Sequence, residues 1–146
     1  MTNDVLEKEY QDLNSIAAVY DYDDFDRDIR HYMIRAMEPF LVPGRALEMG
    51  CAYGEFTEIL SQHYDDLTVI DAAEEFLDHT RNRLGDKATY ILSLFETYQP
   101  KEEEKYDAIF IMHTLEHLID PVDTMRRAKS WLTPKGRLYL VVPNAN

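Results

Sequence analysis

The chain has 146 residues, of which 45% are hydrophobic, and it carries a formal net charge of −13 at pH 7. This length and composition suit one globular domain with a substantial core. The acidic surplus argues against a general affinity for nucleic acid, because phosphate contacts need clustered Lys and Arg.

No stretch approaches the roughly eighteen uninterrupted apolar residues of a membrane helix. The N-terminus also lacks the basic and apolar regions of a signal peptide, so we expect no membrane partner. Cys51 is the single cysteine, which excludes an intramolecular disulfide and a zinc site made of cysteines. A reducing compartment fits this cysteine usage, and we expect a cytoplasmic protein.

Residues 1–40 predict a helical segment that precedes the main fold. Residues 3–20 have mixed helical character, and the aspartate-rich stretch 20–26 then breaks the pattern. Beyond it, apolar side chains recur at a helical spacing, at Ile29, Tyr32, Met33, Ala36 and Phe40. We expect this segment to form a lid or the substrate side of a site. Tyr20 and Tyr22 fit such a lid and fit a simple linker equally well.

Residues 41–146 predict an α/β core. Apolar runs at 45–49, 67–71, 89–92, 107–112 and 137–142 indicate strands, and helical patterns lie at 53–63, 73–84 and 121–131. Residues 134–136 predict a turn before the last strand. Continuous apolar strands separated by amphipathic helices favour a parallel sheet with helices on both faces. Right-handed crossovers then predict a Rossmann-like, doubly wound sheet in the order 3-2-1-4-5.

The first strand is followed by a glycine-punctuated turn that indicates a ligand site. Glu48 lies near the end of the strand, and Gly50 and Gly54 precede a helix, the layout of a nucleotide-sized site at a helix N-terminus. Such glycines alone often mark only a turn. However, Asp71 ends the next apolar run about twenty residues further on, where a doubly wound fold places an acid on ribose hydroxyls. Together the two signals predict a crevice above Gly50.

The pattern Glu48-x-Gly50-x-Ala52-x-Gly54 resembles motif I of class I S-adenosylmethionine (SAM)-dependent methyltransferases. That motif usually has a third glycine at the position of Ala52.

Three later segments extend the resemblance, which covers residues 25–146. Residues 106–111 resemble the strand-four motif of the family, and Gly136 with the following strand resembles its strand-five motif. Residues 112–121 resemble the Met-Glu-x-Leu-Glu-His-x-x-Asp-Pro signature of small-molecule methyltransferases, including ubiquinone-type O-methyltransferases.

The resemblance implies SAM as the cofactor and S-adenosylhomocysteine (SAH) as the product. Glu48 would face the ammonium group of SAM, Asp71 would accept both ribose hydroxyls, and Ala72, Leu94 and Phe95 would flank the adenine. Ordinary core packing is an equally good explanation for Leu94 and Phe95. The cofactor-binding residues that it implies are Glu48, Gly50, Cys51, Ala52, Gly54, Asp71, Ala72, Leu94, Phe95 and Met112.

His113 and His117 are the candidate catalytic residues. His113 follows the fourth strand and could accept a proton from an acceptor hydroxyl or amine. His113, Glu116 and His117 are also weak candidates for a metal site, because some relatives bind a divalent ion through a Glu-x-x-Glu-His arrangement. We expect no metal, since the first position here is histidine, and Glu116 and His117 can simply cap the following segment.

The family sheet normally has seven strands, and this sequence stops just after the fifth. We therefore expect a fragment of a longer enzyme that binds SAM but turns over poorly alone. The fifth strand would have an exposed edge, through which the chain could form a homo-oligomer.

We predict a SAM-dependent methyltransferase that acts on an oxygen or nitrogen of a small molecule. One alternative is a nicotinamide oxidoreductase, which needs Gly-x-Gly-x-x-Gly, whereas residues 51–53 between the two glycines here are Cys, Ala and Tyr. Another is a SAM-binding module without turnover. The sequence does not identify the acceptor.

Overall fold

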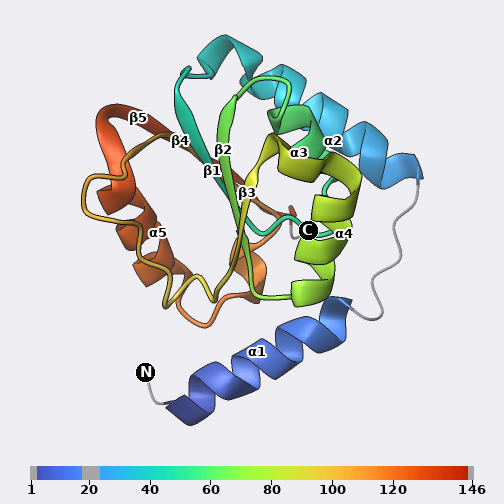
Figure 1. Ribbon diagram of the computed structural model, residues 1–146, viewed down its shortest axis with the longest axis vertical. Coiled ribbons are helices and arrows are strands. Elements are labelled where there is room, and N and C mark those ends of the chain that lie inside the picture. Colours follow the sequence, from blue (N-terminus) through green and yellow to red (C-terminus); the bar gives the residue numbers. More distant parts are fainter. Residues whose placement is uncertain (1–2, 18–23, 145–146) are drawn as a thin grey trace.

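The structure is a computed structural model that describes residues 3–17 and 24–144. Five parallel strands form one sheet in the order β3-β2-β1-β4-β5 (Figure 1), which confirms the predicted topology. The strands are β1 (Arg45–Met49), β2 (Asp66–Asp71), β3 (Thr89–Leu92), β4 (Tyr106–Met112) and β5 (Leu132–Val141). The α-helices are α1 (Asn3–Ala17), α2 (Asp24–Met37), α3 (Glu55–Leu60), α4 (Glu74–Leu84) and α5 (Pro121–Trp131). Short 3₁₀ turns are η1 (Glu38–Phe40), η2 (Gly85–Lys87) and η3 (Leu115–His117).

Helices cover both faces of the sheet, as predicted, but they cover them unequally (Figure 1). Apolar side chains of α2, α3 and α4 pack on one face in a core that includes Phe56, Leu60 and Leu77. On the other face, α5 is the one α-helix of the described residues that packs on the sheet, with Trp131, while η3 contributes Leu115 and the segment after β3 contributes Phe95 and Tyr98. The connection from β3 to β4 therefore covers part of the sheet where a doubly wound fold usually has a helix.

The buried face of α2 differs from the predicted one. Arg30 and Ile34 are buried, whereas Tyr32, predicted on the apolar face, is 71% exposed, and Phe40, which lies beyond α2 in η1, is 59% exposed. Met33, also predicted on that face, does pack against the core. Residues four apart share one face of a helix, so the helix is rotated relative to the apolar pattern and turns an arginine inward. Tyr20 and Tyr22 lie outside the described residues.

The turn predicted at residues 134–136 lies inside β5. Pairing with β4 moves from Tyr106–Leu132 to Ala108–Arg137, so the intervening part of β5 forms an irregularity rather than a separate turn. Thr133 donates a hydrogen bond to Asp107 there, at 3.0 Å. β5 is the edge strand of the described sheet, and Leu140 beside this edge is half-exposed.

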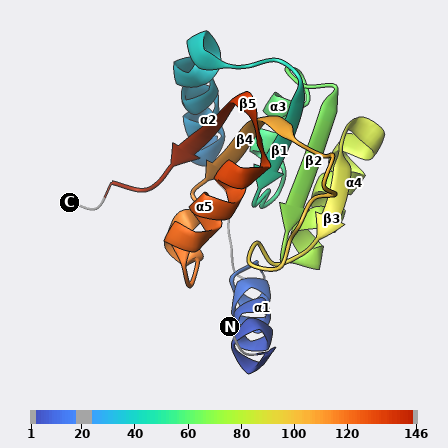
Figure 2. The ribbon, with the colours of Figure 1, turned by 90° about the vertical axis from the view of Figure 1, so that its left-hand side faces the viewer.

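Helix α1 lies apart from the sheet, beyond the carboxyl ends of the strands, and it contacts α4 (Figures 1 and 2). Within residues 3–17 and 24–144, no helix is both long enough and apolar enough to cross a lipid bilayer.

A carboxyl group lies in the core of the sheet. Glu48 on β1 is 1% exposed, and neither of its side-chain oxygens has a hydrogen-bond partner among the described residues. Burial raises its pKa to about 8, although the neighbouring Thr57 hydroxyl and the positive charge of Arg30 act in the opposite direction. The Glu48 side chain is therefore mostly protonated at neutral pH, because an ionised carboxylate without donors is costly to bury.

We predict that Glu48→Gln stabilises the fold at pH 8 but not at pH 5. An unfolded chain releases the Glu48 proton above its ordinary pKa of 4.5, while the folded chain keeps it until about pH 8. The contribution of this group is thus fully present below pH 4.5 and is lost as the pH rises to about 8. Glutamine mimics the neutral acid and does not titrate, so its advantage should grow to about a few kcal/mol.

Urea unfolding at both pH values checks this, with Glu75→Gln on the exposed side of α4 as the control. That control should change stability little at either pH. A Glu48→Gln effect of the same size at pH 5 and pH 8 would contradict a neutral buried acid.

Candidate functional site

The loop after β1 has a backbone that only small residues tolerate. Gly50, Ala52 and Gly54 all have positive φ, at +88°, +45° and +83°. A Cβ on Gly50 would lie 2.5 Å from the Thr114 hydroxyl oxygen, and one on Gly54 would lie 2.8 Å from Thr80. Both glycines are therefore required by backbone conformation and by tertiary packing. Ala52 adopts the left-handed conformation at a cost of about 1–2 kcal/mol.

The carboxylate of Asp71 fixes this loop from the neighbouring strand. Its Oδ2 accepts a hydrogen bond from the Cys51 backbone N–H at 2.8 Å, and its Oδ1 accepts one from the Ala73 N–H at 2.9 Å. From α4, the Thr80 hydroxyl donates to the Ala52 carbonyl at 3.3 Å. The end of β2 thus holds both the glycine loop and the start of α4 in one arrangement.

Asp71 keeps capacity for a ligand. It is 8% exposed, and burial raises its pKa, while the hydrogen bonds from Ala73 and Cys51 lower it. Each carboxylate oxygen can accept two hydrogen bonds, and the backbone uses one on each. A pair of neighbouring hydroxyls could donate to the remaining positions.

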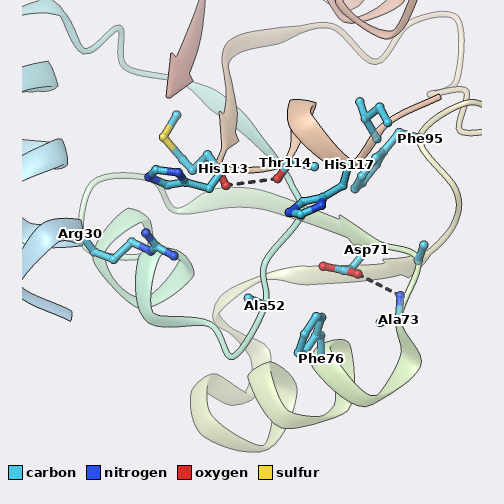
Figure 3. A pocket seen from close by; sticks show the side chains of 13 residues that line it. Arg30, Ala52, Asp71, Ala73, Phe76, Phe95, His113, Thr114 and His117 are labelled. Carbon is cyan, nitrogen blue, oxygen red and sulfur yellow. Dashed lines mark hydrogen bonds between the residues drawn. The ribbon is translucent and has the colours of Figure 1, made fainter. Parts of the chain in front are cut away.

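These elements surround a cleft at the carboxyl ends of β1, β2 and β4. It encloses about 700 Å³, a volume that includes the solvent at its open mouth. Arg30 and His113 lie toward one end, Ala73 and Phe95 lie toward the other, and Asp71 lies between them (Figure 3). The lining residues are Arg30, Gly50, Ala52, Asp71, Ala72, Ala73, Phe76, Phe95, Met112, His113, Thr114, His117 and Leu118.

Six of the ten predicted cofactor residues border this cleft, namely Gly50, Ala52, Asp71, Ala72, Phe95 and Met112. Glu48, Cys51, Gly54 and Leu94 do not. Cys51 and Gly54 shape the loop from behind, through the Asp71 contact and through a turn in which Gly54 N–H donates to the Cys51 carbonyl at 2.9 Å. Glu48 lies in the core and Leu94 is half-buried, so direct ligand contacts from these residues stay predictions.

Both predicted catalytic histidines border the cleft. His113 has φ +53°, and its Nδ1 lies 3.9 Å from the Glu116 carboxylate. A non-glycine residue with positive φ is uncommon and recurs at functional sites, although histidine tolerates it better than most. Among residues 3–17 and 24–144, no three His, Cys, Asp or Glu side chains are grouped to hold a metal ion. The structure therefore does not support a metal site at His113, Glu116 and His117.

Sequence reasoning missed five of the lining residues: Arg30, Ala73, Phe76, Thr114 and Leu118. Phe76 is an apolar residue of the helix predicted at 73–84, and its ring packs against Tyr53 at 5.0 Å. No sequence pattern marked Thr114 as a site residue. Its hydroxyl donates to the Met49 carbonyl at 3.2 Å and lies against Gly50. The one sequence signal for Arg30 is its position four residues before the apolar Ile34, because residues four apart share one face of a helix.

A parallel sheet in this order, with a glycine loop after β1 and a buried acid ending β2, is common to nucleotide-binding doubly wound folds, and here it matches the class I SAM-dependent methyltransferase fold. A family model described as a methyltransferase domain matches residues 20–146. The chain therefore belongs to the methyltransferase domain family, as the resemblance in its motifs predicted.

Two of three curated relatives are named as methyltransferases, one for nitrogen and one for oxygen. The chain is 39% identical over 97 residues, 64% of its length, to nodulation protein S of Rhizobium tropici. It is 33% identical over 104 residues, 66% of its length, to the N-terminal Xaa-Pro-Lys N-methyltransferase 1 of Danio rerio. It is 29% identical over 105 residues, 70% of its length, to the ubiquinone biosynthesis O-methyltransferase of Vibrio vulnificus. The chain spans 40%, 46% and 45% of the lengths of these three proteins.

Solved structures are similar to this one. The N-methyltransferase NodS of Bradyrhizobium japonicum, in complex with SAH, matches 89% of this chain and 70% of its own, with a TM-score of 0.74 and 27% identity. A DhpI–SAH complex matches 94% of this chain and 69% of its own, with a TM-score of 0.79. At 19% identity, the second match shows the fold alone.

We predict that Ala52→Gly stabilises the protein slightly, by about 0.5–1 kcal/mol. Glycine removes the cost of the left-handed conformation, of about 1–2 kcal/mol, and adds an entropic cost of about 0.5–1 kcal/mol. Ala108→Gly is the matched control, because Ala108 lies inside β4 and has no positive φ. Denaturant unfolding should show the control to be destabilised. A loss of stability in Ala52→Gly as large as that of the control would show that Ala52 is not strained.

Proposed function

We propose that this protein binds SAM in the cleft and transfers its methyl group to an oxygen or nitrogen of a small-molecule acceptor. The observation that carries the proposal is the Asp71 carboxylate, which is held by the Cys51 and Ala73 backbone and retains lone pairs for a ribose hydroxyl pair. Membership in the methyltransferase domain family supports it. The same membership favours methyl transfer over the nicotinamide alternative.

The layout of the cleft matches the three chemical parts of SAM. The Arg30 guanidinium, at one end, would bind the carboxylate of the methionine part. The loop from Gly50 to Ala52 would let the ligand pass close to the backbone. Phe95, at the other end, would pack against the adenine together with Ala73.

SAM supplies a methyl group that is already activated for transfer by its sulfonium. The chain then has to align the acceptor and remove a proton where the acceptor loses one. His113 borders the cleft at the Arg30 end and is the group we assign to that proton. Relatives named as an N-methyltransferase and as an O-methyltransferase fit either kind of acceptor.

We also assign roles to two regions outside the lining of the cleft. Within residues 1–40, we assign α1 to a lid, because it lies beyond the carboxyl ends of the strands (Figure 1), the ends at which the cleft lies, whereas α2 packs on the sheet. The exposed edge of β5 is the surface we assign to self-association or to further strands. We propose a cytoplasmic location, with no nucleic-acid or membrane partner, from the acidic charge and the single cysteine.

A calorimetric titration with SAM, SAH and NAD tests the proposed cofactor. We expect saturable binding of SAM and SAH, and no binding of NAD at the same concentrations. Binding of NAD alone would overturn the proposal, and binding of SAM without methyl transfer to any acceptor would favour a module without turnover.

We predict that Asp71→Ala weakens SAH binding about ten- to hundredfold, because two hydrogen bonds to a charged acceptor are lost. The variant should also unfold more easily, since the N–H groups of Cys51 and Ala73 lose their acceptor. Asp66→Ala is the matched control, because Asp66 begins the same strand and its exposed carboxylate pairs with Arg45 at 2.8 Å. An unchanged dissociation constant in Asp71→Ala, measured where the variant is folded, would remove Asp71 from the site.

We predict that His113→Asn lowers the rate of methyl transfer by about a hundredfold and leaves SAH affinity unchanged. Labelled SAM and a panel of amine and hydroxyl acceptors measure this, in this chain and in a form that continues past Asn146. His117→Asn is the comparison, because His117 borders the same cleft without the strained backbone of His113. Equal rates for wild type and His113→Asn would show that the proton leaves without this histidine.

A further inference from the structure

The segment from Ser93 to Tyr98 forms one wall of the cleft but contains no regular element beyond a turn. The N–H groups of Thr97 and Tyr98 both donate to the Leu94 carbonyl, at 3.2 and 2.9 Å, and the Ser93 N–H donates to the Asp71 carbonyl at 2.9 Å. Phe95, inside this turn, is buried and lines the cleft. The position of the Phe95 ring therefore depends on what holds the turn in place.

Arg127 on α5 holds the turn from outside the cleft. Its Nη1 donates a hydrogen bond to the Glu96 carbonyl, and its Nη2 donates one to the Tyr98 carbonyl. The Glu96 carbonyl belongs to the residue directly after Phe95. A guanidinium is a planar fork with donors at fixed separation, so it can fix two carbonyls at once where an ammonium fixes one point.

The guanidinium is itself held by aromatic side chains. Its central carbon lies 5.6 Å from the ring of Trp131, one turn further along α5. The Tyr98 ring meets Trp131 edge-on at 5.3 Å, and the hydroxyls of Tyr98 and Tyr106 lie 2.6 Å apart. Arg127, Trp131, Tyr98 and Tyr106, which we call the Arg127 clamp, thus connect α5, the turn and β4.

We infer that Arg127 is a positioning residue that sets the affinity of the cleft for the adenine end of SAM without touching it. The inference rests on the proposed function and extends it to a residue outside the lining of the cleft. Among the described residues, α5 is the one α-helix on this face of the sheet, and the Arg127 clamp holds Phe95 where a doubly wound fold usually has a crossover helix. Loss of the fork would free the turn, and Phe95 would no longer be fixed where the ligand needs it.

The test is the affinity of Arg127→Met for SAH and for 5′-methylthioadenosine, which has the adenosine part and lacks the amino-acid part. We expect both ligands to bind about three- to thirtyfold more weakly, the usual size of an effect transmitted through a packed network. Arg30→Met, at the other end of the cleft, should weaken only SAH. A purely structural role for Arg127 would lower stability but leave both dissociation constants unchanged at a temperature where the variant is folded.

Lys105→Met is the matched control for Arg127→Met. Lys105 lies in the same β3–β4 connection and donates from its Nζ to the Ser130 carbonyl of α5 at 2.9 Å, but it lies far from Phe95 in the sequence. We expect unchanged affinity for both ligands. Equal affinities in Arg127→Met and Lys105→Met would overturn the inference.

Arg127→Lys keeps the inference testable if Arg127→Met does not fold. It retains the charge near Trp131 but cannot donate to both carbonyls, so we expect weakened binding of both ligands at nearly wild-type stability. Wild-type affinity in this variant would contradict a role for the fork. A wild-type chain that binds neither ligand would instead contradict the proposed function, and the role of Arg127 with it.

Discussion

The hydrogen bonds of the Asp71 carboxylate are the interaction on which the site depends. β1 and β2 end side by side, and the chain leaves them in two directions, into the glycine loop and into α4. After each strand, one backbone N–H has no partner in a helix or strand: that of Cys51 after β1 and that of Ala73 after β2. The Asp71 carboxylate accepts a hydrogen bond from both. Because the donors are backbone groups, the carboxylate is held in one orientation at the border of the cleft.

Two buried acids, Glu48 and Asp71, show how donors decide the state of a carboxyl group in this fold. Glu48 has no hydrogen-bond partner among the described residues, and burial raises its pKa to about 8. Asp71 is nearly as buried, and burial also raises its pKa, but the N–H groups of Ala73 and Cys51 oppose this rise. Asp71 is therefore suited to accept hydrogen bonds from a ligand, whereas Glu48 is a mostly neutral part of the core.

Threonines on later elements set the shape of the glycine loop. Thr114, after β4, occupies the space that a side chain on Gly50 would need, and Thr80 on α4 does the same for Gly54. Thr114 also bonds to the end of β1, and Thr80 to the loop itself. The loop thus depends on contacts from segments that follow it by about thirty and sixty residues. Arg127 likewise holds the turn after β3, on the opposite side of the cleft, by a contact between residues distant in the sequence.

The strand order, the parallel pairing and the placement of the glycine loop beside Asp71 were determined by the sequence itself. Apolar runs and helical periods are local signals, and the handedness of crossovers leaves few ways to connect them. The irregular part of β5 escaped prediction because residues 134–136 contain turn formers whose pairing depends on β4. Nothing local distinguishes a proline–glycine turn from a bulge in an edge strand.

Only the tertiary structure decided which side chains meet in the cleft. Arg30 faces inward because α2 packs with Ile34 against the sheet, and this rotation is not encoded by the apolar pattern of the helix alone. Thr114 and Arg127 act through contacts with residues distant in the sequence, which leave no periodic trace. A motif can indicate that a ligand binds above Gly50, but the groups that hold its walls are selected by packing, which appears only when the chain is folded.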